Sequence, residues 1–201
     1  MKTMDNNQNE LLHKADYWKL LSMCFAYPED KVLDKVSNLA GELKNKTSGN
    51  TRRHSLLENL EDIKSTEEIQ KDYSVFFVQG RLPLNESFCS SKLDAIADVS
   101  AFYNAFGLKS RSGDAPDSLS YELEFLSLLC LKAALADDQE KRDICESAYT
   151  EFLNDHMSEF QIKFVEKTKH IDLGSFYGKA LELLELYVQE EFKQTMKLRV
   201  I

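Results

Sequence analysis

A single carboxylate, Glu122, interrupts the most apolar segment of the chain, PDSLSYELEFLSLLCLKAAL at residues 116–135. In a helix, Glu122 lies one turn before Leu126 and two turns before Leu129, on a face that a central helix of a bundle would bury. Because burying an unpaired carboxylate is costly, the group needs a partner or a raised pKa. Glu122 is therefore either a site residue beside a cleft or a structural carboxylate bonded to a loop's backbone N–H groups or to Arg81.

Histidines are the other candidates for chemistry. Glu10-x-x-His13 has the spacing of di-iron bundles, but that site needs a second such motif and two further glutamates, and no second motif occurs. His54, His156 and His170 lack the HxxxH and HExxH ligand spacings. The sequence also contains no GxGxxG, GxxxxGK[ST] or GxSxG motif. We therefore predict that the protein is not an enzyme and holds no metal or cofactor.

The composition favours helices. The chain has 201 residues, 43% of them hydrophobic, enough for one compact domain, although two small ones would also fit. It has only 7 glycines and 3 prolines, the residues that sheets and loop-rich folds use at their turns. A formal net charge of -9 argues against nucleic-acid binding, which depends largely on Lys and Arg. The acidity either keeps the protein soluble or suits a basic partner.

The sequence also indicates the cellular compartment in which the protein is expected. Cys24, Cys89, Cys130 and Cys145 form no CxxC pair, which is typical of buried thiols in a reducing environment. No stretch reaches the roughly 18 apolar residues that a membrane span requires. The polar start, MKTMDNNQNELLHK, lacks the apolar core of a signal peptide. We expect a cytoplasmic protein without stable membrane insertion.

These candidate residues must be positioned by helices, because apolar residues recur at spacings of three and four along nearly the whole chain. We predict an all-α fold, a single bundle domain over residues 1–201 with about eight to ten helices. Loops near 80–92 and 108–116 interrupt the pattern and are candidate hinges. Helical stripes are expected at 11–25, 32–43, 56–63, 69–77, 93–106, 116–135, 144–153, 157–165 and from about 172.

Local signals mark several helix ends. Ser65 with Glu68 has the form of a capping box at a helix start. Gly107 suits a left-handed helix end. Behind Pro116, either Asp117 or Ser118 can cap the helix that carries Glu122.

Three stretches have the order and spacing of motifs in one known family. YSVFFVQGRLPLNESF matches a helix that ends in Leu-Phe and is followed by Gly, prolines and a Glu-Ser-Val-Tyr-like run. PDSLSYELEFL matches Pro-x-Asp-His-x-x-x-Glu-Leu-x-Phe-Met, and FLNDHMSEFQIKF matches Phe-Leu-x-x-His-Leu-x-x-Trp-x-x-x-Phe. With the closing FYGKALELL, the chain from about residue 10 to 192 resembles the TorD/DmsD/NarJ group of cytoplasmic chaperones, which mature molybdenum-containing redox enzymes.

The resemblance implies a TorD-like bundle and a partner. Such chaperones bind the twin-arginine leader of a DMSO-reductase-type catalytic subunit and hold the precursor back until molybdopterin is inserted. The expected partner is thus a molybdopterin oxidoreductase precursor with its twin-arginine signal peptide, and the expected state is a monomer or a helix-exchanged dimer. The alternative is an adaptor that binds a mature region of the enzyme without recognising the leader.

A leader has a basic part and an apolar part, so an aromatic groove with an acidic rim would complement it. By resemblance, Glu86, Asp117 and Glu122 supply negative charge or brace the loop between helices, while the aromatic side chains belong either to the groove or to the core. The full set of expected leader-binding or partner-binding residues is Tyr73, Phe77, Pro83, Glu86, Ser87, Phe88, Asp117, Ser118, Tyr121 and Glu122.

The sequence departs from the family pattern at several positions. Ser118 stands where the family has a histidine, and Asn85 and Cys89 stand where aromatics are usual. His156 matches the family's other histidine, but it follows Asp155 at an expected helix start, so we interpret it as structural.

Overall fold

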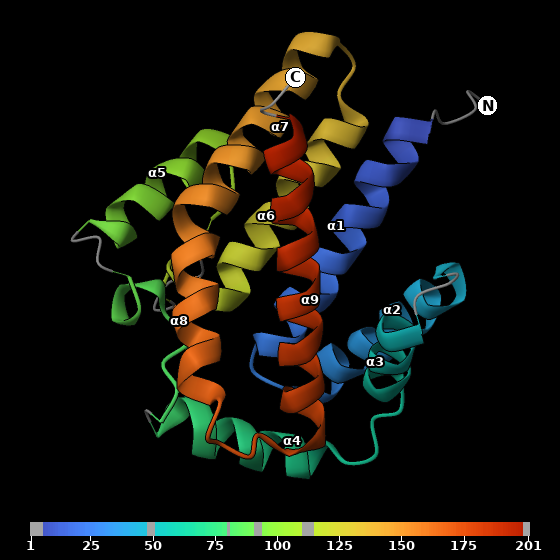
Figure 1. The fold of residues 1–201 in the computed structure, drawn as a ribbon, viewed down its shortest axis with the longest axis vertical. Helices are drawn as coiled ribbons and strands as arrows, with labels where there is room; N and C mark the ends of the chain where they lie inside the picture. Colours follow the sequence, from blue (N-terminus) through green and yellow to red (C-terminus); the bar gives the residue numbers. More distant parts are fainter. Residues whose placement is uncertain (1–5, 48–50, 80, 91–93, 110–114, 199–201) are drawn as a thin grey trace.

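The computed structural model describes residues 6–47, 51–79, 81–90, 94–109 and 115–198. Within these ranges the regular structure is helical, with no β-strand, so the predicted all-α class is confirmed (Figure 1). Residues 80, 91–93 and 110–114 of the two expected hinge loops lie outside the described residues. The α-helices are α1 (Asn6–Phe25), α2 (Asp30–Lys46), α3 (Thr51–Glu61), α4 (Thr66–Tyr73), α5 (Ala95–Phe106), α6 (Leu119–Leu135), α7 (Gln139–Phe152), α8 (Ser158–Thr168) and α9 (Gly174–Leu198).

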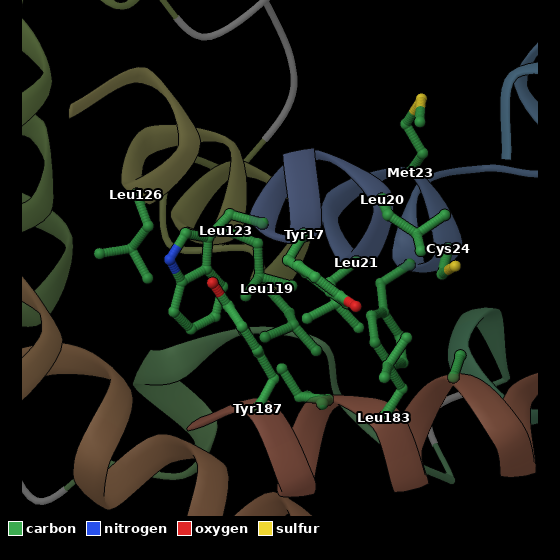
Figure 2. Packing of buried hydrophobic residues seen from close by; sticks show 14 of the residues in the cluster. Tyr17, Leu20, Leu21, Met23, Cys24, Leu119, Leu123, Leu126, Leu183 and Tyr187 are labelled. Carbon is green, nitrogen blue, oxygen red and sulfur yellow. The ribbon is translucent and has the colours of Figure 1, made fainter. Parts of the chain in front are cut away.

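The core forms where α1, α6 and α9 meet, and α1 packs most extensively against α6. Figure 2 shows aromatic and leucine side chains of α1, including Tyr17 and Leu21, facing Leu183 and Tyr187 of α9, with Leu123 of α6 beside them. All five side chains are buried. The apolar character of the 116–135 segment therefore reflects a central position in the bundle, as the sequence predicted.

Polar residues on α6 bind α1. The Ser127 hydroxyl donates to the Ala15 carbonyl at 2.8 Å, and the Ser120 hydroxyl donates to the Ser22 carbonyl at 3.0 Å. The Lys19 ammonium group on α1 forms an ion pair with Glu124 at 2.7 Å. These bonds satisfy polar groups at a close helix pair, so the narrow polar stripe of α6 faces a neighbouring helix.

Two helical runs contain π-helical segments. The segment Ser74–Val78 extends α4, and the segment Leu153–Met157 joins α7 directly to α8. The expected helix start at Asp155 and His156 is therefore wrong, since both residues lie inside a continuous helical run. A π-helical turn adds a residue to the ring that its hydrogen bond closes and so changes which side chains face inward. Here it accompanies complete burial of His156.

The helix ends predicted from local sequence signals are partly confirmed. The Ser65 hydroxyl accepts a hydrogen bond from the Glu68 N–H at 3.2 Å, and Gly107 ends α5 with φ of 76°. Ser118 is the N-cap of α6, but its side chain makes no capping bond. The four cysteines are free and buried, as predicted. None of the described helices combines the length and apolar character that crossing a membrane requires.

Candidate functional site

Residues 82–90, which we call the connector, are attached to the start of α6 by backbone hydrogen bonds. The Glu86 N–H donates to the Asp117 carbonyl at 2.8 Å, and the Leu119 N–H donates to the Leu84 carbonyl at 2.7 Å. Asn85 and Ser118 form an isolated antiparallel bridge between these two bonds. The connector thus pairs with the residues that begin α6.

Asp117 strengthens this attachment through its side chain. One carboxylate oxygen accepts the Ser87 N–H at 3.0 Å, and the other accepts the Asn85 side-chain amide at 3.2 Å. Asp117 is buried, and hydrogen bonds from polar groups are what a buried carboxylate requires. The carboxylate that binds the loop's backbone is therefore Asp117.

A buried ionic cluster lies behind the connector. The Nδ1 atom of His156 lies 2.9 Å from a carboxylate oxygen of Glu86, and its Nε2 atom lies 3.5 Å from the carboxylate of Asp98 on α5. Glu86 and His156 are both 0% exposed. His156 is thus hydrogen-bonded to Glu86 through one ring nitrogen, and its other ring nitrogen lies near Asp98 at a longer distance.

Glu122 lies beside this cluster, near Glu86 and Asp117. It is 0% exposed, and neither carboxyl oxygen has a hydrogen-bond partner among the described residues. Burial raises the pKa of Glu122 well above its usual range, and the nearby carboxylates of Glu86 and Asp117 raise it further. The expected bond to a loop N–H or to Arg81 is therefore wrong, and Glu122 shows instead a raised pKa, the other outcome expected for a buried carboxylate without such a bond.

Tyr73 and Phe77 belong to a partly exposed aromatic cluster. The Tyr73 ring lies 5.5 Å from Tyr27 and 5.3 Å from Phe77, and Phe77 lies 5.0 Å from Tyr177 of α9. Tyr27 is 53% exposed, whereas Tyr73 and Phe77 are half-buried. We call Tyr27, Tyr73, Phe77 and Tyr177 the aromatic face. The Leu82 N–H donates to the carbonyl of neighbouring Phe76 at 2.8 Å, which joins this part of the chain to the connector.

The remaining expected residues differ in exposure. Phe88 is 69% exposed and Ser87 is exposed, whereas Pro83, Ser118 and Tyr121 are half-buried. The structure thus brings Glu86, Ser87, Asp117, Ser118 and Glu122 together at the junction of connector and α6. It places Tyr73 and Phe77 together in the aromatic face.

Two cavities among the described residues are lined by none of the ten expected residues. A cleft of about 750 Å³ lies between the end of α3, α4 and the start of α9, and a second of about 390 Å³ lies beside α5 and Pro116. The first contains many carboxylates, which the sequence analysis did not single out. The sequence has six Asp and Glu residues from position 58 to position 72, and five of them line this cleft, but their position beside the start of α9 depends on the tertiary fold. Within the described residues, no group of three or more His, Cys, Asp or Glu side chains could hold a metal ion.

Comparison with known proteins identifies the class. The nitrate reductase delta subunit family matches residues 41–166, well over half of the chain. A crystal structure from Archaeoglobus fulgidus, named as that of a proposed redox enzyme maturation protein, has a TM-score of 0.60, covering 86% of this chain and 92% of that chain at 21% identity. At this identity the likeness establishes the fold. A search of curated proteins found no match.

The fold and the matched family define a chaperone-type maturation protein of redox enzymes. The chain belongs to the nitrate reductase delta subunit family. The resemblance to the TorD/DmsD/NarJ group is thereby confirmed.

Proposed function

We propose that the protein binds the twin-arginine leader of a molybdopterin oxidoreductase catalytic subunit in the cytoplasm and retains the precursor during maturation. The observation that carries this proposal is the aromatic face, where Tyr27 is 53% exposed and Tyr73 and Phe77 are half-buried. Exposed aromatic side chains held on helices are suited to an apolar peptide segment. The net charge of -9 suits the basic part of a leader.

The expected affinity is compatible with release. Burying four apolar side chains of a leader contributes roughly 6–12 kcal/mol. Ordering a flexible peptide costs about 2–5 kcal/mol. A micromolar complex requires about 8 kcal/mol, so reversible micromolar binding lies within this range.

In this proposal the buried carboxylates position the surface that binds the leader. Glu86 and Asp117 are occupied by His156 and by connector donors, and burial raises the pKa of Glu122. Glu86 and Asp117 therefore brace the connector against the start of α6 and the π-helical segment between α7 and α8. The leader contacts exposed side chains of the connector, such as Phe88, and the aromatic face.

Affinity capture from native cytosol, followed by mass spectrometry, tests the proposal. The expected result is recovery of an oxidoreductase precursor that still carries its leader. A Tyr73→Ala/Phe77→Ala variant should lose this precursor, whereas Ile144→Ala, which removes an exposed apolar side chain of α7, should retain it. Loss of precursor from both variants, or from neither, would count against recognition by the aromatic face.

A second candidate is favoured by the family itself, whose description names a nitrate reductase subunit. In this alternative the protein is an adaptor that binds a mature region of its partner enzyme. Recovery of leaderless subunits alone, at equal yield from wild type and the double variant, would establish the adaptor in place of the leader-binding chaperone.

A further inference from the structure

The connector covers three buried carboxyl groups that come from two parts of the chain. Glu86 belongs to the connector itself, whereas Asp117 and Glu122 lie at the start of α6, and none of them is more than 1% exposed. Glu86 and Asp117 are near enough to Glu122 to affect its ionisation. Three groups that can each become negative therefore share one region from which water is excluded, where like charges repel most strongly.

The hydrogen-bond donors of this region serve only two of the three carboxyl groups. Asp117 accepts two donors of the connector, and Glu86 lies 2.9 Å from the Nδ1 atom of His156. Both oxygens of Glu122 and one oxygen of Glu86 have no hydrogen-bond partner among the described residues. The attached connector thus confines a carboxyl group that water would hydrate if the connector moved away.

The titratable groups around Glu122 come from several elements. They face it directly or through Glu86, and they are Glu86 and Cys89 of the connector, Asp117 of α6, Tyr103 and Asp98 of α5, and His156 of the π-helical segment. Within this set, His156 is the one base. Lys167 of α8 lies 3.5 Å from the Cys89 sulfur and donates to the Phe88 carbonyl at 3.1 Å. Ionisation of Glu122 therefore adds negative charge to a group that is mostly acidic.

The attachment of the connector determines how readily Glu122 holds its proton. Burial raises the pKa of Glu122 well above its usual range, and Glu86 and Asp117 raise it further. In an open form, with the connector separated from the start of α6, the hydrated carboxyl would have the pKa of an exposed glutamate, about 4.3. Between these two pKa values, the closed form keeps a proton that the open form releases. The open population therefore rises by up to about tenfold per pH unit in that window.

The connector is attached in a way that permits local opening. Its regular structure is one short 3-10 helix, Glu86–Phe88, and both Ser87 and Phe88 are exposed. Its attachment to α6 consists of the two backbone bonds and the Asp117 bonds described above. Segments held mainly by hydrogen bonds near the surface open at a lower free energy than core helices do. The connector can thus open while α1, α6 and α9 remain packed.

We propose that the connector opens away from the start of α6 in a proton-coupled step, in which Glu122 releases its proton to water, so that opening becomes more frequent as the pH rises. The open form exposes Glu86, Glu122 and the Cys89 thiol to solvent. This conformational device is built from the fold alone and goes beyond the proposed function, because it does not depend on what the protein binds.

Cys89 makes the opening measurable without an added probe. Its thiol is 5% exposed in the connector, whereas Cys24 of α1 is 1% exposed in the core and reports wider unfolding. The native protein is treated with 4,4′-dithiodipyridine, which reacts with thiols at acid and neutral pH, at pH 5.5, 6.5 and 7.5. Peptide mass spectrometry measures the labelling rate of each cysteine. A synthetic peptide of residues 82–90 gives the rate of the exposed thiol at the same pH, and the ratio of the two rates is the protection of Cys89.

The measurement compares wild type with Glu122→Gln and with the control Glu140→Gln, which removes an exposed carboxyl of α7. In wild type and in the control, the protection of Cys89 should fall by about three- to tenfold from pH 5.5 to pH 6.5. In Glu122→Gln it should change by less than about twofold, because the proton is no longer there to be released. In all three proteins Cys89 should react faster than Cys24, since local opening precedes wider unfolding.

Two outcomes would overturn the proposal. If the protection of Cys89 falls equally with pH in wild type and in Glu122→Gln, or falls in neither, the opening is not coupled to the Glu122 proton. If Cys89 and Cys24 react at the same rate, the connector opens only when the whole protein unfolds. Circular dichroism verifies that each variant is folded. Should Glu122→Gln fail to fold, Glu122→Met, which also lacks a titratable group, takes its place with the same expected result.

Discussion

Replacing Glu122 by glutamine should stabilise the protein, increasingly so as the pH rises. The carboxyl is fully buried, has no hydrogen-bond partner among the described residues, and lies near the carboxylates of Glu86 and Asp117. Glutamine has nearly the same shape and carries no charge at any pH. The substitution therefore removes an unfavourable ionisation without opening a cavity.

The pH dependence follows from the direction of the pKa shift. The unfolded carboxyl has a pKa of about 4.3. Because the folded pKa is raised, the folded state keeps a proton that the unfolded state releases. The wild type therefore loses stability as the pH rises from the unfolded pKa towards the folded one. The loss is about 1.4 kcal/mol for each pH unit in that window, and the variant does not share it.

Urea unfolding at pH 5, 6 and 7 measures the difference between Glu122→Gln and wild type. The expected difference grows by about 1.4 kcal/mol from pH 5 to pH 6, which corresponds to roughly 3–6 °C in melting temperature for a chain of this length. Glu140→Gln, which removes an exposed carboxyl of α7, controls for net charge and should show no such slope. A difference that stays constant over this range would show that Glu122 is ionised in the folded protein, contrary to our reasoning.

Three further substitutions test the bonds of the site. His156→Ala should cost about 3–5 kcal/mol in urea unfolding because it leaves the Glu86 carboxylate buried without its partner, and a cost below about 1 kcal/mol would contradict the ionic cluster. Asp117→Ala should cost about 2–4 kcal/mol and speed proteolytic cleavage within the connector, since two donors lose their acceptor; unchanged cleavage would refute this role. Gly174→Ala should lower the melting temperature more than Gly107→Ala. Both positions have positive φ, but only at Gly174 would the new Cβ atom collide with a side chain; equal effects would contradict the close approach.

The fold was predictable because its local signals agree with its packing. The spacing of Leu119, Leu123 and Leu126 gives α6 one continuous apolar side. The sequence shows no long alternation of apolar and polar residues that would favour strands over helices. Gly107 and Ser65 identify helix ends because their bonds form within a few residues of themselves. Signals of this kind need no knowledge of the neighbouring helices.

The site was less predictable because its bonds cross large distances in sequence. Glu122 and Asp117 are both acidic residues near the start of α6, and only the tertiary structure gives connector donors to Asp117 and none to Glu122. The π-helical segment around His156 adds a residue to the helical turn and so shifts the apolar spacing between α7 and α8. From the sequence alone, this shift suggests two separate helices where the structure has one continuous helical run. The cleft of about 750 Å³ with its five carboxylates forms only when α4 meets the start of α9.

The three stretches that carry the family resemblance meet at one buried cluster, and this gives their fixed order a physical reason. Each supplies one buried titratable side chain: Glu86 from the first, Asp117 from the second and His156 from the third. Because they are buried, each depends on its bonding partners, Glu86 on His156 and Asp117 on the Ser87 N–H and the Asn85 amide, and losing such a partner costs about 1–5 kcal/mol. Exposed side chains such as Tyr27 and Phe88 are not constrained by burial in this way. Recognition of the family therefore depends on residues that hold the connector in place, and under the proposed function the exposed residues beside them would contact the partner.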